Sequence, residues 1–350
     1  MSCRLSPYNT RVMANDLFDL LVIGAGPTGL ACAIEAHKAG LTAVVVDKGC
    51  LVNSLFHYPA NMTFFTTPEL LEIGDIPFSS PHQKPTRQEA LEYYRKVAEH
   101  YRLNLRLYQH VDQATGEDGN FRVLTTDLHH CPHEYHARKL VIATGYYDLP
   151  NLLNIPGEEM PKVSHYYREP HPYFACDVVV IGGKNSAAIA ALELWRHGAR
   201  VTLVHRASGL HPHVKYWIKP DLENRIKAEE ISACFSSSVT AIEADAVVLN
   251  TPEGERRLAN DFVFALTGYH PDFTFLRSLG VELRTLPALA DDPQVENVSP
   301  VFHPQTLESN VPGVYLAGVI VAGSRTNEIF IENGRFHGKV IADDVRRRRQ

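Results

Sequence analysis

The chain has 350 residues and a formal net charge of −6, and this length predicts about two domains. Hydrophobic residues make up 45% of the sequence and no low-complexity tract interrupts it, so we expect a globular protein. The mild acidity does not indicate binding to nucleic acid or to a membrane surface, and no apolar run reaches the ~18 residues that cross a bilayer.

The cysteines and the first residues indicate the compartment. Six cysteines are scattered along the chain, and no two of them form a C-x-x-C pair. This usage predicts free thiols in a reducing, cytoplasmic setting. Residues 1–17 lack the regions of a signal peptide and are expected to form a leader before the first strand.

Residues 18–48 predict a strand, a glycine-rich turn, a helix and a second strand. The turn follows the G-x-G-x-x-G pattern: Gly24 allows a tight turn, Gly26 lets the backbone approach a pyrophosphate, and Gly29 lets helix and strand pack closely. The helix N-terminus offers N–H groups to phosphates. Asp47 ends the second strand, where a carboxylate accepts hydrogen bonds from an adenosine ribose. We interpret the stretch as a dinucleotide site rather than a plain βαβ unit.

Residues 49–81 are rich in turn formers and aromatic side chains and are expected to run along the cofactor. Asn53, Thr63, Phe64 and Thr67 are candidates to line a flat ring system, and ordinary loop packing is the alternative for each.

An amphipathic helix is predicted over 87–102 from its apolar spacing. A short strand over 104–107 follows, and then Val111, at a point where the chain often pairs with adenine in this architecture. Strands over 121–126 and 135–142 complete a meander.

The turn inside this meander contains His129, His130, Cys131, His133 and His136. Their spacing matches no standard zinc motif. We therefore expect an exposed hairpin tip and no metal.

A buried strand is predicted to end in Ala143, Thr144 and Gly145. Such a turn of small residues lets the backbone lie close to a nucleotide. Residues 146–156 are punctuated by proline and lead out of the first domain.

A second copy of the opening unit begins at Asp177 and repeats it without a gap at an offset of 158 residues. Repetition of a whole unit is stronger than either motif alone. Gly182 opens the second turn, and His205-Arg206 replaces Asp47. Because a carboxylate selects a free 2′-hydroxyl and a basic residue accommodates a 2′-phosphate, the first site suits FAD or NAD and the second suits NADPH.

Lys184 departs from the second fingerprint, because it stands where the second glycine belongs. Either the turn uses Gly183 for the close approach, or the ammonium group contacts a phosphate. Lys215, within residues 211–226, is a candidate to assist Arg206, and a surface helix is the alternative for that segment.

The remaining elements close the second domain and return to the first. Strands are expected near 233–235, 239–242, 246–250 and 262–266, before Thr267-Gly268, which echoes Thr144-Gly145. An apolar strand over 311–318 is predicted to return to the first domain, followed by a helix over 326–342. Glu332, Asn333 and Arg335 lie near this helix, and Arg346–Arg349 are interpreted as a solvated helix end.

Two tandem nucleotide sites of opposite 2′ preference, each followed by a Thr-Gly turn, resemble the two-dinucleotide-domain flavoproteins, of which the thioredoxin reductases are compact members. The segments Gly24–Ala31, Leu51–Ser54, Thr63–Phe65, Leu71–Phe78, Gly182–Gly198, Val214–Ile226 and Ile329–Gly338 are similar to the bacillithiol-disulfide reductase family. The resemblance covers nearly the whole chain after residue 17, and GGKNSA at residues 182–187 is that family's version of the second fingerprint.

The resemblance implies an α/β fold with two Rossmann-like domains. Residues 1–157 and 288–350 would form the FAD domain, and residues 158–287 the inserted NADPH domain. It implies a reductase that passes hydride from NADPH to FAD and then reduces a low-molecular-weight disulfide such as bacillithiol disulfide, without a C-x-x-C.

The residues assigned to the cofactors follow from the motifs and the resemblance. For FAD they are Gly24, Gly26, Pro27, Thr28, Gly29, Asp47, Lys48, Asn53, Thr63, Phe64, Val111, Ala143, Thr144, Gly145 and Gly318. For NADPH they are Gly182, Gly183, Lys184, Asn185, Ser186, Arg206 and Gly268. The sequence identifies no catalytic side chain.

Thr28 is a departure from the family, whose better-studied members place a cysteine between the proline and the last glycine of the first fingerprint. Cys32 lies one helical turn further on and is interpreted as a small packing residue. Without a thiolate beside the flavin, thiol–disulfide exchange lacks its obvious nucleophile.

Three other functions remain open. One is an NADPH reductase of a ferredoxin- or flavodoxin-type carrier protein, which needs no cysteine. A flavin monooxygenase is the second, because Pro156-Gly157 and His165–Tyr167 partly match its linker. The third is a flavin- and NADPH-binding redox sensor with low turnover. The expected partner is thus a small disulfide or a small redox carrier protein, with no nucleic acid and no membrane, and a homo-oligomer is compatible with the sequence.

Overall fold

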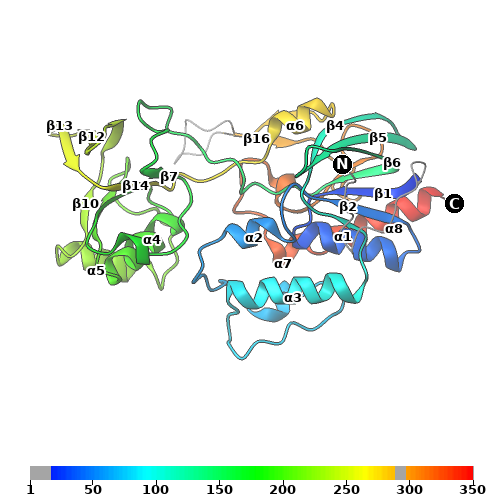
Figure 1. Ribbon diagram of the computed structural model, residues 1–350, viewed down its shortest axis with the longest axis horizontal. Coiled ribbons are helices and arrows are strands. Elements are labelled where there is room, and N and C mark those ends of the chain that lie inside the picture. The colour runs from blue at the N-terminus through cyan, green and yellow to red at the C-terminus, as the bar shows by residue number, and fades with distance from the viewer. Residues whose placement is uncertain (1–16, 288–296, 350) are drawn as a thin grey trace. The chain divides into compact units, whose positions relative to one another are not determined.

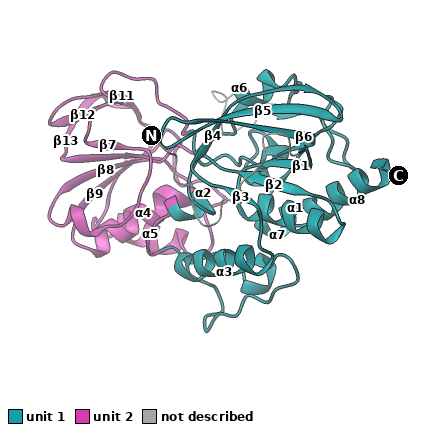
Figure 2. Ribbon diagram, turned by 45° about the vertical axis from the view of Figure 1, so that its right-hand side comes forward, with its two compact units in different colours: residues 1–56, 62–149, 269–350 teal, residues 57–61, 150–268 magenta. Residues whose placement is uncertain are grey.

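The computed structural model describes residues 17–287 and 297–349 (Figure 1). The chain folds into two compact units, coloured teal and magenta in Figure 2. Unit 1 takes the described residues up to 56, then 62–149 and those from 269 onward, and unit 2 takes 57–61 and 150–268. Each unit combines strands with helices around a mainly parallel sheet, so the predicted α/β class is confirmed.

The predicted domain limits lie after residues 157 and 287, whereas the main limits of the two units lie after residues 149 and 268. The assignment of FAD to the first domain and NADPH to the second stays a prediction. Most of the predicted leader (1–16), Cys3 and the residues from 288 to 296 lie outside the described residues.

Unit 1 is built on a seven-stranded sheet. The strands along the sheet are β3 (Leu105–Arg106), β2 (Ala43–Val46), β1 (Leu17–Ile23), β6 (Pro132–Ile142), β5 (Asn120–Asp127) and β4 (Gln109–Glu117), with β17 (Val314–Leu316) also paired to β6. β1 runs parallel to β2 and β6. Its apolar run Leu20–Ile23 is buried, as expected for a strand covered on both faces. β17 joins β6 in parallel, which confirms the predicted return of a late strand to the first sheet.

The helices of unit 1 cover this sheet and its loops. They are α1 (Pro27–Lys38), α2 (Asn53–His57, ending at the unit boundary), η1 (Pro68–Leu71), α3 (Arg87–His100), α6 (Phe273–Ser278), η3 (Gly318–Ala322), α7 (Ile331–Gly334) and α8 (His337–Arg349). The short strands β15 (Leu283–Thr285) and β16 (Val298–Pro300) form a separate two-stranded sheet. α3 begins with a capping box, in which the Thr86 hydroxyl accepts from Glu89 N and the Glu89 carboxylate accepts from Thr86 N. This cap explains why the predicted helix over 87–102 begins at Arg87.

Unit 2 repeats the design on a smaller scale. Its five-stranded parallel sheet has the order β10 (Ser232–Cys234), β9 (Arg200–Val204), β8 (Asp177–Ile181), β14 (Phe262–Ala265) and β7 (Val163–Ser164). A separate antiparallel sheet holds β11 (Ser238–Ile242), β12 (Ala246–Thr251) and β13 (Gly254–Ala259), and the helices are η2 (His171–Tyr173), α4 (Asn185–Arg196) and α5 (Lys219–Lys227). The predicted gap-free repeat of strand, turn, helix and strand is therefore present as β8, α4 and β9.

One predicted element is corrected by the structure. The helix expected over 326–342 is instead two helices, α7 and α8. Residues 326–330 are not helical, and α7 begins after Phe330, whose N–H donates to the Asn333 side chain (2.7 Å). α8 then approaches α1 so closely that a Cβ on Gly338 would lie 2.7 Å from Ala31 O.

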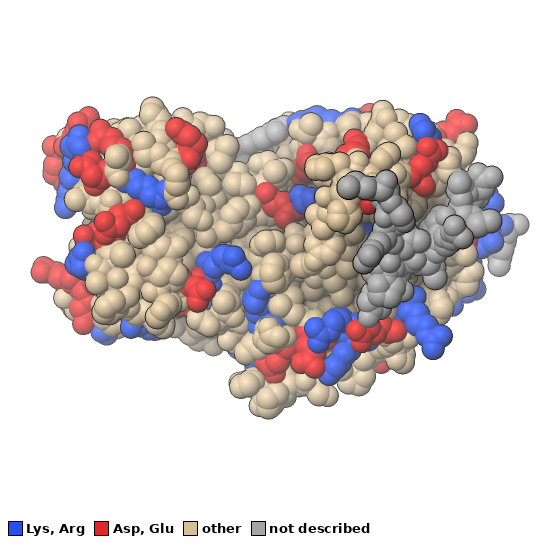
Figure 3. All heavy atoms as spheres, viewed as in Figure 1, with Lys and Arg blue, Asp and Glu red and all other residues tan. Residues whose placement is uncertain are grey.

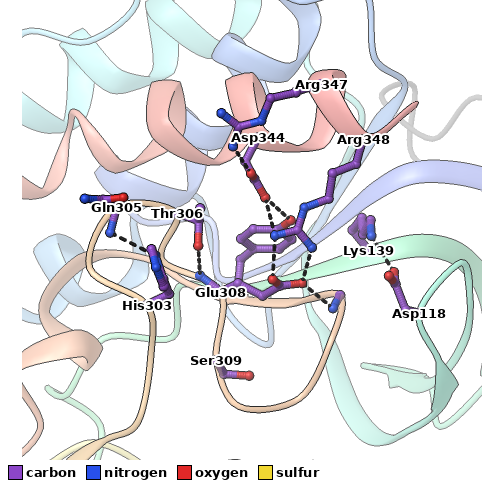
Figure 4. A network of polar contacts seen from close by, with 12 residues as sticks. Asp118, Lys139, His303, Gln305, Thr306, Glu308, Ser309, Asp344, Arg347 and Arg348 are labelled. Atoms are coloured by element: carbon purple, nitrogen blue, oxygen red, sulfur yellow. Dashed lines mark hydrogen bonds and ion pairs between the residues drawn. The ribbon is translucent and has the colours of Figure 1, made fainter. Parts of the chain in front are cut away.

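The arginine run at the end of α8 is exposed, as predicted, and Arg347, Arg348 and Arg349 also form ion pairs, of which Figure 4 shows those of Arg347 and Arg348. Arg348 makes a bidentate contact with Glu308 (2.7 and 2.9 Å) and also reaches Asp344 (2.9 Å). Asp344 is buried and accepts from the Tyr315 hydroxyl (2.7 Å) and from Arg347. These contacts tie α8 to β17 and to the loop before it.

Candidate functional site

The glycine turn of unit 1 has a different steric environment at each glycine. Gly24 has φ +112°, and a Cβ there would lie 2.4 Å from Ala143 O at the end of β6. A Cβ on Gly29 would lie 1.9 Å from Gly24 O, so the third glycine lets α1 pack on β1. At Gly26 a Cβ would meet no atom within 4 Å. The second glycine therefore leaves open space next to the N-terminus of α1, where Pro27 is buried as the first helical residue and where a pyrophosphate would bind.

Asp47 follows β2 and is fixed against this turn. Its carboxylate accepts hydrogen bonds from Ala25 N (2.6 Å) and Gly49 N (2.8 Å). Burial raises the pKa of Asp47, and these two backbone donors oppose that rise. Since a carboxylate has about four acceptor positions, it keeps capacity for the hydroxyl groups of a ribose.

The other residues predicted along the cofactor are placed by local contacts. Lys48 forms an ion pair with Asp148 (2.9 Å), and Asn53 accepts from Cys50 N (3.3 Å) at the start of α2. Phe64 is buried, and Thr63 forms an isolated bridge with Thr86.

Val111 lies in β4 and packs against the core of the sheet. Thr67 is the N-cap of η1. The burial of Phe64 is what the loop-packing alternative predicts for that residue.

The end of β6 carries an unsatisfied polar atom. Ala143 N donates to Ile23 O (2.8 Å), which continues the pairing of β6 with β1. The next side chain, Thr144, has a buried hydroxyl that lacks a hydrogen-bond partner among the described residues. Gly145 follows, and a Cβ there would meet no atom within 4 Å. Because buried polar groups are normally satisfied, this edge of the sheet fits a bound polar ligand.

Thr28 lies at a tight junction of three segments of unit 1. A Cβ on Gly318 or on Gly334 would lie 3.1 Å from the Thr28 Oγ1 atom. Gly318, the first residue of η3, donates its N–H to His337 Nδ1 (3.0 Å). Burial lowers the pKa of His337 to about 4, so the ring is neutral and accepts this bond at physiological pH.

His337 was missed by the sequence reasoning, although it lies within the segment Ile329–Gly338 that carries the family resemblance. The neighbouring candidates have local roles instead. Arg335 donates to Glu69 O and Glu72 O (2.8 Å each), which fixes η1, and Asn333 caps α7.

The turn of unit 2 repeats the first glycine and replaces the second. Gly182 has φ +143°, and a Cβ there would lie 2.6 Å from Leu266 O, just as Gly24 abuts Ala143 O. Lys184 is the N-cap of α4 with φ −102° and ψ −172°, an extended conformation that any residue adopts. The departure from glycine at Lys184 therefore causes no strain.

Gly183 is the tight position of this turn, because a Cβ there would lie 2.3 Å from His205 Nε2. His205 follows β9 at the position of Asp47. Burial lowers the pKa of His205, and electrostatic interaction with Arg206, His211 and Lys184 lowers it further. Basic side chains thus gather around the second turn, whereas a carboxylate occupies the first.

The remaining NADPH candidates lie at the start of α4 or in the loops after β9 and β14. Arg206 and Ser186 are exposed. Gly268 follows the sheet, and its carbonyl accepts from Asn151 N (2.9 Å). Asn185 is committed to contacts with residues 213 and 215.

None of the five described cysteines is in a disulfide. Cys32 is buried in α1, and burial raises its pKa to about 12, so it is protonated at neutral pH and is the packing residue that we expected. At the hairpin tip, the Asp127 carboxylate accepts from His129 N and Cys131 N and contacts His133. In residues 17–287 and 297–349, no three His, Cys, Asp or Glu side chains are grouped to hold a metal.

Within the same residues, no helix is long and apolar enough to cross a membrane.

Comparison with known proteins agrees with this geometry. A family model described as pyridine nucleotide-disulphide oxidoreductase matches residues 21–318. Bacilliredoxin reductase Bdr of Bacillus subtilis (strain 168) is 45% identical over 329 residues, covering 94% of this chain and 97% of the relative. Structures of Bacillithiol Disulfide Reductase Bdr from Bacillus cereus and Staphylococcus aureus each superpose with a TM-score of 0.89, at 42% and 40% identity. They cover 95% and 96% of this chain and 100% of each relative.

Proposed function

Because the chain belongs to the pyridine nucleotide-disulphide oxidoreductase family and is an FAD- and NADPH-dependent oxidoreductase, we propose that it reduces bacillithiol disulfide. The similarity to the Bdr proteins over nearly the whole chain is the observation that carries this proposal. In balanced form, NADPH, one proton and one disulfide give NADP⁺ and two thiols.

We assign FAD to the turn of unit 1. The open side of Gly26 and the α1 N-terminus would receive the pyrophosphate, and Asp47 would accept hydrogen bonds from the ribose. Thr144 offers an unsatisfied hydroxyl to the ligand. Bound FAD supplies a two-electron carrier between NADPH and the disulfide, and the protein orients it.

We assign NADPH to the turn of unit 2. Gly182 allows the turn, and the N-terminus of α4 would face the pyrophosphate. Arg206 stands next to the position that Asp47 occupies in unit 1, and there its guanidinium would contact the 2′-phosphate. His205, kept neutral by burial and by the neighbouring positive charges, would contribute a hydrogen bond rather than a charge.

Thr28 and Cys32 bear on how electrons reach the disulfide. Thr28 stands where the better-studied members of the resembled family have a cysteine, and its hydroxyl cannot form a mixed disulfide. Cys32 is buried, and its raised pKa keeps it a thiol, which is a poor nucleophile. We therefore propose that no cysteine thiolate at this turn takes part in the reduction.

The test is NADPH consumption by the holoenzyme with a panel of acceptors. Bacillithiol disulfide should support turnover with two thiols formed per NADPH, whereas glutathione disulfide and oxygen should be much slower. Oxidised bacilliredoxin is an arm of the panel, because a relative is named for that protein. Alkylation of native enzyme with iodoacetamide should change the rate by less than about twofold, since the buried Cys32 thiol reacts slowly. NADPH consumption that no disulfide accelerates would refute the proposal.

The panel of acceptors also includes ferredoxin, which represents the carrier-protein alternative. A reductase of an acidic carrier protein would need a basic docking surface. Among the coloured residues of the face drawn in Figure 3, basic and acidic side chains are interspersed. That face therefore presents no purely basic surface to an acidic carrier. We also propose a reducing, cytoplasmic setting, which the unbridged cysteines support.

A further inference from the structure

The second glycine turn is held from outside by residues His211–Trp217, which we call the covering segment. His211 N donates to Gly183 O in the turn (3.0 Å). Val214 is buried in the core of unit 2 and anchors the middle of the segment. The covering segment thus lies against the turn through its backbone before α5 begins.

Asn185, the first residue of α4, clamps this segment with both ends of its amide. Its Oδ1 atom accepts from Lys215 N (2.9 Å), and its Nδ2 atom donates to His213 O (3.4 Å). The amide is therefore engaged with the backbone of the covering segment, which makes a positioning role more apt than a direct contact with a nucleotide.

The first site provides an internal comparison. At the 158-residue offset, Asn185 corresponds to Pro27, whose side chain has no donor or acceptor. The loop after β2 still reaches its turn, because Val52 N donates to Ala25 O (3.0 Å), the counterpart of the contact between His211 and Gly183. The backbone contact is thus common to both sites, and the amide clamp is confined to the basic one.

The covering segment brings His211 to this turn, where its N–H donates to Gly183 O. The ring of His205 covers Gly183. Lys184 from the turn, Arg206 after β9 and His211 from the covering segment all act electrostatically on His205. His211 is held to the turn by its own N–H on Gly183, and the bonds of Asn185 to residues 213 and 215 fix the rest of its segment, which contains no helix or strand.

We propose that Asn185 is a positioning residue for NADPH selection: it clamps the covering segment so that His211 stays beside His205 and Arg206, completing a basic site for a 2′-phosphate. The inference rests on the proposed NADPH site in unit 2.

The test compares Asn185→Ala with Asn224→Ala, an exposed asparagine in α5 of the same unit. Binding of 2′,5′-ADP by calorimetry needs no turnover and should weaken about tenfold in Asn185→Ala, the effect of losing about one net hydrogen bond. KM for NADPH should rise by a similar factor, while kcat and KM for NADH change less than twofold. Asn224→Ala should match the wild type in each measurement.

The outcomes separate this inference from the function on which it rests. Wild-type protein that fails to bind 2′,5′-ADP would refute the NADPH assignment itself. If the wild type binds 2′,5′-ADP, two results would overturn only the role of Asn185. One is an Asn185→Ala variant that binds 2′,5′-ADP as tightly as the wild type. The other is an equal rise of KM for NADPH and NADH in that variant. Asn185→Ser is a milder change that should show the same selective loss of 2′,5′-ADP and NADPH affinity. It replaces the alanine variant in this test if that variant does not fold.

Discussion

Gly26 and Gly29 allow cofactor binding to be separated from folding. Both are glycines of the same turn, yet a Cβ on Gly29 would lie 1.9 Å from Gly24 O, and a Cβ on Gly26 would meet no protein atom within 4 Å. We therefore expect Gly26→Ala to leave the apoprotein stable and to abolish FAD binding, because the added methyl group occupies the space for the pyrophosphate.

The stability change in Gly26→Ala is the sum of two small effects. Gly26 is the N-cap of α1 with φ −72° and ψ 174°, so alanine fits the backbone and gains about 0.4–1 kcal/mol from a less flexible unfolded chain. Alanine is a poorer N-cap than glycine, at a cost of up to about 1 kcal/mol. The two effects nearly cancel, and the free energy of unfolding should stay within about 1 kcal/mol of the wild type.

Gly29→Ala serves as the contrast. Its methyl group overlaps backbone, so α1 must move away from β1 at a cost of about 1–3 kcal/mol or more. The assay is chemical denaturation of each apoprotein, combined with flavin absorbance per protein after addition of FAD. Gly26→Ala protein that binds stoichiometric FAD with wild-type affinity would refute the assignment of the pyrophosphate to this turn.

Three further predictions concern one residue each. Arg206→Ala should raise KM for NADPH about tenfold to hundredfold, as expected for a charge-assisted hydrogen bond, and steady-state kinetics should show NADH nearly unaffected. For His337, whose folded pKa of about 4 lies below its usual 6.5, the unfolded state binds the extra proton, so stability should fall by about 3 kcal/mol as the pH drops from 6.5 to 4. His337→Asn, which keeps an acceptor for Gly318 N, should flatten this part of the pH profile in denaturant titrations. Asp344→Ala should lower the free energy of unfolding by about 2–4 kcal/mol, because it leaves buried polar partners unsatisfied. The adjacent, exposed Asp343→Ala should cost less than about 0.5 kcal/mol.

Each of these has a result that contradicts it. Equal rises of KM for NADPH and NADH in Arg206→Ala would remove the basis for a 2′-phosphate contact. An unchanged pH profile in His337→Asn would show that other groups cause the acid sensitivity. Equal stability of the Asp344 and Asp343 variants would mean that the contacts at the end of α8 do not hold the helix (Figure 4).

The sequence predicted the parts of the fold that have strong periodicity or repeat. Buried strands such as β1 and β8 are continuous apolar runs, and α3 has both an amphipathic face and a capping box. By contrast, β13 was missed, because all its residues are at least partly exposed and lie at the edge of a small sheet. Most of β4 was missed because its residues after Gln109 are at least partly exposed and it lies at the edge of the seven-stranded sheet.

The sites show the same division. The two glycine turns follow local spacing and could be located from the sequence, and the steric environment of their glycines agrees with the roles expected for them. The contact between His337 and Gly318 joins residues from separate helices, and the clamp of Asn185 on Lys215 spans 30 residues. No periodicity encodes such tertiary contacts, so only the folded chain reveals them.

The most direct test of the central claim is an anaerobic titration of the holoenzyme. NADPH should bleach the flavin absorbance, and bacillithiol disulfide added afterwards should restore it with two thiols released per NADPH consumed. The contrary result is a flavin that NADPH reduces and that ferredoxin, but not bacillithiol disulfide, reoxidises. That result would identify the protein as a reductase of a carrier protein.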